Sequence, residues 1–146
     1  MNRYQNFTIL INKISREIRR IKNLEMKEYG LKSPHVSCLY SFYKEKKLTS
    51  KQLADICEED KAAISRTIDY LEKNGYIVCE SDAKKRYRDY FKLTEKGLLI
   101  GEILSNKIDM IVDEASKELS DEHKKLLYES LEVISTNLEN HQKSES

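Results

Sequence analysis

The sequence predicts a mostly α-helical fold with one small β-hairpin, and three observations lead to this prediction. Apolar residues recur at the helical spacing of three and four through most of the 146 residues. Glycine and proline are scarce, with four and one respectively, so helices have few breaks. The segments 76–79 and 87–93 read instead as two strands separated by a polar, basic turn.

The first helix is expected over residues 2–28. Its apolar residues form a coiled-coil-like row with alternating spacings of four and three: Phe7, Ile11, Ile14, Ile18 and Ile21. Cations occupy the opposite side, and Gly30 ends the helix. A helix this long and apolar needs more partner surface than a small domain supplies, so we expect it to pack against a second chain.

The second helix should begin at Ser33-Pro34, with Ser33 as the N-cap and Pro34 in the first turn. Its inward residues are expected to be Val36, Leu39, Tyr40 and Tyr43. Lys44, Lys46 and Lys47 should lie in its last turn, where the helix dipole favours cations.

Thr49 and Gln52 form a capping-box pattern that predicts a short third helix, with Leu53, Ile56 and Cys57 on its buried side. Asp60 should cap a fourth helix that ends at Asn74-Gly75. Ile64, Ile68 and Leu71 face its core. This arrangement leaves a polar face to solvent: Lys61, Ala62, Ser65, Arg66, Asp69 and Lys73.

The hairpin carries a basic cluster made of Lys84, Lys85, Arg86 and Arg88, and residues 83–92 have a net charge of +4. Thr94 should then cap a fifth helix over residues 95–119, and Ser120 a sixth. Leu126, Leu127, Leu131, Ile134 and Leu138 repeat helically in the sixth, and the tail after residue 141 is expected to fray.

Charge and cysteine content limit the function classes. The net charge of +1 divides into +5 over residues 1–32 and −5 over residues 113–146, so the basic turn is a local feature. We expect no signal peptide, no membrane span and a cytoplasmic location. Three widely spaced cysteines and three dispersed histidines predict no disulfide, metal site or cofactor. Without a phosphate loop or nucleophile elbow, an enzyme is not expected.

Two helices followed by a basic hairpin form the order of a helix-turn-helix with a wing. In that arrangement the second helix enters the DNA major groove with its N-terminal exposed residues, here Lys61, Ala62, Ser65, Arg66 and Asp69. Arg66 can contact guanine bidentately. One of Lys84, Lys85, Arg86 and Arg88 can enter the minor groove.

These residues resemble the winged-helix domain of the MarR family of bacterial transcription regulators. The similarity rests on Leu48-Thr49 with Leu53-Ala54, Asp60-Lys61 with Ile64-Ser65-Arg66, Leu71–Ile77, and Leu93-Thr94-Glu95-Lys96-Gly97. It implies a single domain over residues 1–146, with a DNA-binding winged helix at 33–97 and dimerisation helices at 1–32 and 98–146. It also implies a homodimeric repressor on a palindromic operator, relieved by a small-molecule effector, by oxidation or by a metal.

The sequence departs from the family pattern at two places. Lys85 and Tyr87 stand where the family wing commonly reads Asp-x-Arg, so Arg86 or Arg88 would take the minor-groove role. Ala62-Ala63 occupies positions where hydroxyl residues are frequent, which leaves contact with thymine methyl groups as a substitute.

The remaining candidates are a sensor site and an alternative function. The family resemblance places effector pockets between the first two helices and the winged domain, where Arg16, His35 and Tyr40 are candidate lining residues. Cys57 and Cys79 are expected to be small buried side chains, whereas Cys38 could be accessible and redox-active. The alternative function is a winged-helix adaptor that binds protein and does not read DNA sequence.

Overall fold

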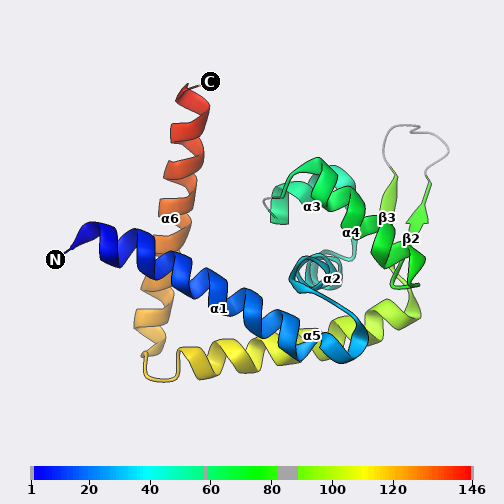
Figure 1. Cartoon of the computed structure of the whole chain (residues 1–146), viewed down its shortest axis with the longest axis horizontal. Helices are drawn as coiled ribbons and strands as arrows, with labels where there is room; N and C mark the ends of the chain where they lie inside the picture. Colours follow the sequence, from blue (N-terminus) through cyan, green and yellow to red (C-terminus); the bar gives the residue numbers. More distant parts are fainter. Residues whose placement is uncertain (1, 58, 82–88, 146) are drawn as a thin grey trace. The chain divides into compact units, whose positions relative to one another are not determined.

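The computed structural model describes residues 2–57, 59–81 and 89–145 (Figure 1). The helices and strands follow in the order η1 Tyr4–Ile9 (a π-helical segment), α1 Leu10–Glu25, η2 Lys27–Tyr29 (a 3₁₀ turn), α2 Ser33–Glu45, β1 Lys47–Thr49, α3 Ser50–Cys57, α4 Lys61–Lys73, β2 Ile77–Glu80, β3 Tyr90–Leu93, α5 Glu95–Ala115 and α6 Asp121–Glu145. The chain forms two compact units, Met1–Lys107 and Ile108–Ser146. The predicted fold class, mostly helical with a small hairpin, is confirmed.

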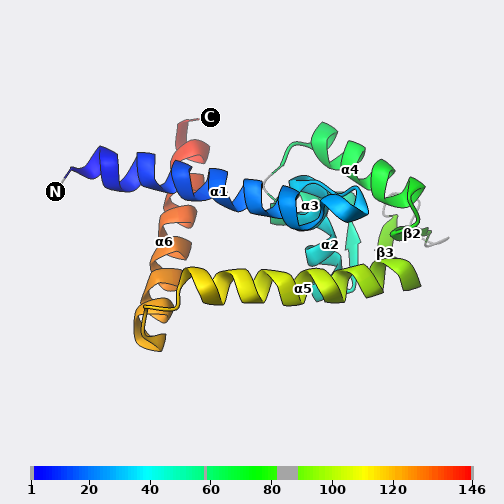
Figure 2. The same ribbon diagram turned by 60° about the horizontal axis from the view of Figure 1, so that its bottom comes forward.

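Helix α2 is the centre of the first unit (Figure 2). It packs against α1, α3 and α4 and against strands β1 and β3. Val36, Cys38, Leu39 and Phe42 on this helix are each at most 1% exposed. Buried side chains over two consecutive helical turns explain why the neighbouring elements are organised around it.

Both ends of α2 differ from the prediction. Lys32, not Ser33, is the N-cap, and its backbone N–H donates to Nδ1 of His35 at 2.9 Å. The N–H of Ser33 is already paired with Oδ1 of Asn23 at 2.7 Å. At the other end the helix stops at Glu45, because Lys46 adopts φ 68° and ψ −47°. Lys47 therefore starts a strand and does not belong to the last helical turn.

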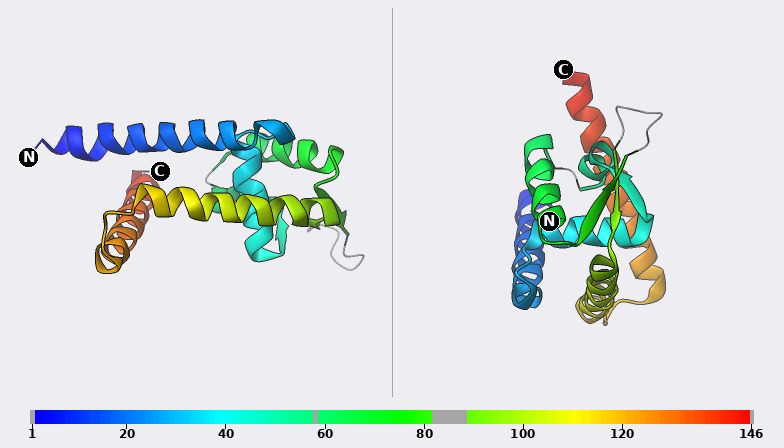
Figure 3. Two further views of the ribbon diagram at one scale, coloured as in Figure 1. Left: turned by 90° about the horizontal axis from the view of Figure 1, so that it is seen from below. Right: turned by 90° about the vertical axis from the view of Figure 1, so that its right-hand side faces the viewer.

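Strand β1 was not predicted, and it completes a three-stranded antiparallel sheet of order β1-β3-β2 (Figure 3). Leu48 in β1 pairs with Phe91 in β3, and its side chain is only 5% exposed. Glu80 at the end of β2 bridges the outer strands: its carboxylate lies 2.7 Å from Nζ of Lys47 and 2.5 Å from Nζ of Lys92. Hydrogen bonds from these two ammonium groups lower the pKa of Glu80 to about 2.

The Leu93–Gly97 segment fastens the start of α5 to the residues that follow α4. Oγ1 of Thr94 donates to the carbonyl of Gly75 at 2.5 Å and accepts the backbone N–H of Gly97 at 3.0 Å, which confirms Thr94 as the cap. A Cβ at position 97 would lie 1.9 Å from the carbonyl oxygen of Tyr76. Glycine is required here because the two backbones touch.

Helix α3 is less buried than its pattern predicts. Leu53 is its one fully buried residue, whereas Ile56 is 50% exposed and Cys57 is half-buried. The helix is eight residues long and packs against its neighbours mainly on one side. The expectations for the cysteines were wrong: Cys38 is buried at 1% exposure, and both Cys57 and Cys79 are partly accessible.

Large apolar side chains remain exposed in each unit. In the first unit, one side of the N-terminal helix presents Phe7, Leu10, Ile11, Ile14 and Ile18, which are 40–51% exposed. In the second unit, α6 presents Leu126, Leu127, Leu131, Val133 and Leu138, which are 43–59% exposed. Within the described residues, none of the helices combines the length and the apolar character that crossing a membrane requires.

Candidate nucleic-acid interface

Helix α4 has a capped start and two distinct sides. Oδ1 of Asp60 accepts the backbone N–H of Ala63 at 2.7 Å, which confirms Asp60 as the N-cap. Ile64, Ile68 and Leu71 are buried at 4% exposure or less. On the opposite side, the predicted residues are exposed to solvent: Lys61, Ala62, Ser65, Arg66 and Asp69.

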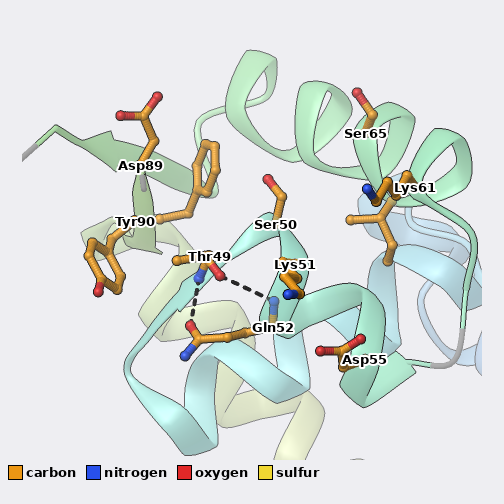
Figure 4. A pocket seen from close by; sticks show the side chains of 11 residues that line it. Thr49, Ser50, Lys51, Gln52, Asp55, Lys61, Ser65, Asp89 and Tyr90 are labelled. Atoms are coloured by element: carbon orange, nitrogen blue, oxygen red, sulfur yellow. Dashed lines mark hydrogen bonds between the residues drawn. The ribbon is translucent and has the colours of Figure 1, made fainter. Parts of the chain in front are cut away.

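A cleft of about 780 Å³ lies between the first turns of α3 and α4 and strand β3 (Figure 4). Its lining combines hydroxyl, amide and charged side chains with a few apolar ones. The lining residues are Thr49, Ser50, Lys51, Gln52, Asp55, Lys61, Ile64, Ser65, Asp89, Tyr90 and Phe91.

The capping box holds the α3 side of this cleft in place. The N–H of Thr49 donates to Oε1 of Gln52 at 2.9 Å, and the N–H of Gln52 donates to Oγ1 of Thr49 at 3.1 Å. This reciprocal pair satisfies two backbone donors at the helix start and confirms the predicted box. Ser50 and Lys51, which lie between the two capping residues, are consequently presented toward the cleft (Figure 4).

The five predicted residues of α4 fall into two rows along the helix. Lys61 and Ser65, four residues apart, line the cleft. Ala62, Arg66 and Asp69 are equally exposed, but they form the adjacent row and do not line it. The interface therefore has two parts, the cleft wall and an open ridge that carries Arg66.

Sequence reasoning missed the contribution of α3 and β3. Ser50, Lys51 and Tyr90 stand beside Lys61 and Ser65 of α4, although they are 10 to 29 positions away in the sequence. The sequence did contain one signal for the contribution of α3. Directly after Thr49, the first turn of the helix carries a small hydroxyl residue, Ser50, and a cation, Lys51. Two acids, Asp55 and Asp89, also line the cleft and offset the charge of its two lysines.

The predicted wing cations Lys84, Lys85, Arg86 and Arg88 lie outside the described residues. The described part of the hairpin is its base, where Glu80 forms ion pairs with Lys92 of β3 and with Lys47 of the neighbouring strand β1. The contribution of the four cations to the interface thus stays a prediction.

The structure does not bring the three candidate effector residues together. Arg16 is exposed on α1, and the ring of Tyr40 lies 5.3 Å from Nζ of Lys44. The ring of His35 stacks on Tyr70 of α4, with centroids 4.1 Å apart and an interplanar angle of 11°. In the described part of the chain, no hydrogen bond, ring contact or ion pair joins any two of these three. Burial lowers the pKa of His35, with a smaller effect from the charge of a neighbouring lysine.

No cluster of three His, Cys, Asp or Glu side chains suited to a metal ion occurs among the described residues. The cleft therefore offers hydrogen-bond donors, acceptors and ammonium groups. Such groups can form hydrogen bonds with base edges and phosphate oxygens.

One part of the chain matches the model of a known family. Residues 29–86 match the model of the MarR family, from the turn before α2 to the hairpin. No curated protein matches the sequence.

Solved structures share the fold over most of the chain. A MarR/EmrR family transcriptional regulator from Acinetobacter sp. ADP1 has a TM-score of 0.86 and 20% identity, over 96% of this chain and 99% of that one. A MarR family protein from Listeria monocytogenes, complexed with a 26mer DNA, has a TM-score of 0.85 and 24% identity, over 90% and 87%. The S. aureus MepR–DNA complex has a TM-score of 0.80 and 19% identity, over 90% and 97%. The resemblance seen in the sequence motifs is confirmed, and at these identities the structures show that the fold is shared.

Proposed function

We infer that this MarR-family chain is a sequence-specific, double-stranded-DNA-binding transcriptional regulator. The finer proposal is a homodimeric repressor that binds a palindromic operator and is released by a small-molecule effector. It is not proposed to be an enzyme.

The observation that carries the proposal is the exposed start of α4. Asp60 fixes its first turn, its buried side anchors it to the core, and short or cationic side chains cover the side that faces solvent. A helix with this surface can approach base edges closely in the major groove. Ser50 and Lys51 on α3 would contact the flanking phosphates from the other wall of the cleft.

The homodimer is supported by the apolar side chains of the N-terminal helix and of α6. Residues such as Ile14 and Leu138, at 51% and 57% exposure, would leave water on association. Two symmetry-related copies of α4 would then read half-sites one helical turn apart, about 34 Å.

For the effector, His35 is the candidate residue with a direct route to the interface. Its ring stacks on Tyr70, whose hydroxyl donates to the carbonyl of Gly30 at 2.7 Å. A small molecule that displaced this stack would act on α4 through Tyr70. Arg16 and Tyr40 remain proposed partners for such a ligand.

The test is selection of bound duplexes from a random DNA library by the full-length protein at physiological salt. We expect a palindrome with half-sites one turn apart. Binding through about 6–10 phosphates should weaken on the order of 10³–10⁵-fold between 50 and 200 mM salt. Recovery of no enriched sequence, with weak binding at every salt concentration, would favour the protein-binding adaptor.

Arg66→Ala and Lys73→Ala form a matched pair for the recovered duplex. Both remove one exposed cation from α4, but Lys73 lies two turns beyond Arg66 and away from the helix start. Loss of Arg66 should cost about 1–3 kcal/mol and relax selection at one base position. Equal, small effects of the two substitutions would count against base reading by α4.

A further inference from the structure

The imidazole of His35 closes the start of α2 as a hydrogen-bond acceptor. Its Nδ1 atom accepts the backbone N–H of Lys32, the N-cap residue, at 2.9 Å. A ring nitrogen accepts a hydrogen bond only when it carries no proton, so His35 is neutral in this arrangement and its proton is on Nε2. The following N–H, that of Ser33, already donates to Oδ1 of Asn23 at 2.7 Å. The N–H of Lys32 therefore depends on a neutral His35.

The segment between α1 and α2 is also tied to α4 and to the turn that follows it. The hydroxyl of Tyr70 on α4 donates to the carbonyl of Gly30 at 2.7 Å. The hydroxyl of Tyr76 donates to the carbonyl of Tyr29 at 3.3 Å. The ring of Tyr70 stacks on His35 with centroids 4.1 Å apart. The start of α2, the connecting segment and the helix of the proposed DNA interface thus meet at one contact.

The surroundings of the His35 ring favour its neutral form. The nearby cations are Lys32 at the N-cap and, from α1, Lys22, which donates to Oγ of Ser37 on α2 at 3.0 Å. The titratable group of α4 that faces the ring is Tyr70. Within the described residues, no carboxylate forms an ion pair with His35. Burial lowers the pKa of His35, and the charge of Lys32 lowers it further.

We propose that His35 is a proton-sensitive switch that loosens the contact between α4 and the segment before α2, so that mild acid weakens DNA binding. This regulation rests on the proposed function. Protonation places an N–H on Nδ1, directly opposite the N–H of Lys32, and two donors do not bond to each other. The ring must then rotate or retreat, and the N–H of Lys32 loses its partner. Gly30, the acceptor of Tyr70, lies two residues earlier and moves with this turn.

The direction of the effect follows from linkage between the proton and DNA. The proton binds better to the loosened arrangement, because Nδ1 is free there, whereas DNA binds better when α4 is held in place. The two ligands therefore oppose each other, and bound DNA must lower the pKa of His35 by the factor with which protonation weakens DNA binding. We expect about 5–10-fold, the low end of ordinary coupling, because Tyr70 lies near the end of α4 that is remote from Asp60.

The protonation step is tested on the full-length protein without DNA. Nuclear magnetic resonance follows His35 separately from the other two histidines over about pH 5–8, the range in which histidines titrate. We expect the proton of neutral His35 on Nε2 and a pKa below 6.5. The amide signal of Lys32 should shift with the same midpoint, because its hydrogen bond breaks. A neutral His35 protonated on Nδ1, or a Lys32 amide that ignores the titration, would overturn the proposal.

The effect on DNA is measured with a duplex that the protein selects from a random library at about pH 7.5. On acidification to about pH 5.5, the affinity of the wild type should fall about 5–10-fold more than that of His35→Gln. Glutamine at this position keeps a capping acceptor but does not titrate; His35→Asn replaces it if that variant folds poorly.

His123→Asn is the matched control, because it removes an exposed histidine from α6. This variant should keep the pH dependence of the wild type. Equal pH dependence of the wild type and His35→Gln would refute the switch, as would a His123→Asn variant that loses the dependence instead. If the protein selects no duplex, the proposed function fails, while the titration still decides whether His35 controls the cap of α2.

Discussion

Replacement of Gly97 by alanine should destabilise the first unit by displacing α5 from the residues after α4. The added Cβ would lie 1.9 Å from the carbonyl oxygen of Tyr76, and such contacts are essentially never shorter than 3.0 Å. The first turn of α5 must therefore retreat by at least about 1 Å. The obstacle is a backbone carbonyl, so no side-chain rotation can relieve it.

The size of the effect follows from the bonds that this retreat breaks. Thr94 donates its N–H to the Tyr76 carbonyl at 3.0 Å and its hydroxyl to the Gly75 carbonyl at 2.5 Å. Each lost bond costs about 1 kcal/mol, and the steric strain adds about 1–3 kcal/mol. The higher helix propensity of alanine offsets about 1 kcal/mol. We expect a net loss of about 2–4 kcal/mol in the free energy of unfolding.

Gly101→Ala is the matched control, one turn later on the same helix. Its Cβ would lie 3.1 Å from Cδ2 of Tyr43, and a side chain can shift by the small distance needed. The gain in helix propensity should nearly cancel this cost, leaving a change within about 1 kcal/mol. Urea unfolding followed by far-ultraviolet circular dichroism, at one protein concentration, measures both. A Gly97→Ala variant as stable as Gly101→Ala would refute the backbone-contact argument.

The remaining predictions concern one cap and two titrating groups. Asp60→Ala should lower the free energy of unfolding by about 0.5–2 kcal/mol, because α4 loses the 2.7 Å hydrogen bond of its N-cap. Thermal unfolding measures the effect. An unchanged midpoint would mean that water fully replaces the capping bond. Burial depresses the pKa of His35 below 6.5, so the unfolded chain takes up the proton first, and stability should fall as pH drops below that value. His35→Asn should remove this part of the pH dependence in urea unfolding, and identical profiles for variant and wild type would exclude it. Alkylation of Cys57 by iodoacetamide should increase with pH around a midpoint near 7, where the pKa of this thiol lies. Burial raises the pKa of Cys79 above 9.0, so the midpoint for its alkylation should be higher. Peptide mass mapping follows the two residues separately, and similar midpoints would contradict the lowered pKa of Cys57.

Local signals were sufficient to predict the helices and all of their predicted N-caps except Ser33, whose place Lys32 takes. Thr49, Asp60, Thr94 and Ser120 each form the bond that their sequence position predicts, and the reason is that a capping bond spans only three residues. The buried row of α4 was predicted for the same reason, because one helix face needs only the spacing of three and four.

Features that depend on contacts between distant segments were missed. Strand β1 contains two polar residues out of three, and it is a strand because β3 pairs with it. Ile56 and Cys57 have the helical spacing from Leu53 that is typical of a buried face. Their actual burial depends on how much of α3 the neighbouring elements cover, which the spacing does not encode. The charge of Lys22 lowers the pKa of Cys57, which lies 35 positions away, and no spacing rule relates the two residues.

The backbone at Lys46 limits how the length of this chain can vary. Its positive φ turns the chain directly from α2 into a strand in which Leu48 alone is buried. Side chains alternate between the two sides of a strand, so inserting or deleting one residue between Glu45 and Leu48 would turn that leucine to solvent and a polar neighbour inward. Homologous chains should therefore tolerate substitution at this junction far better than a change in residue number, and an alignment across it should need no gap.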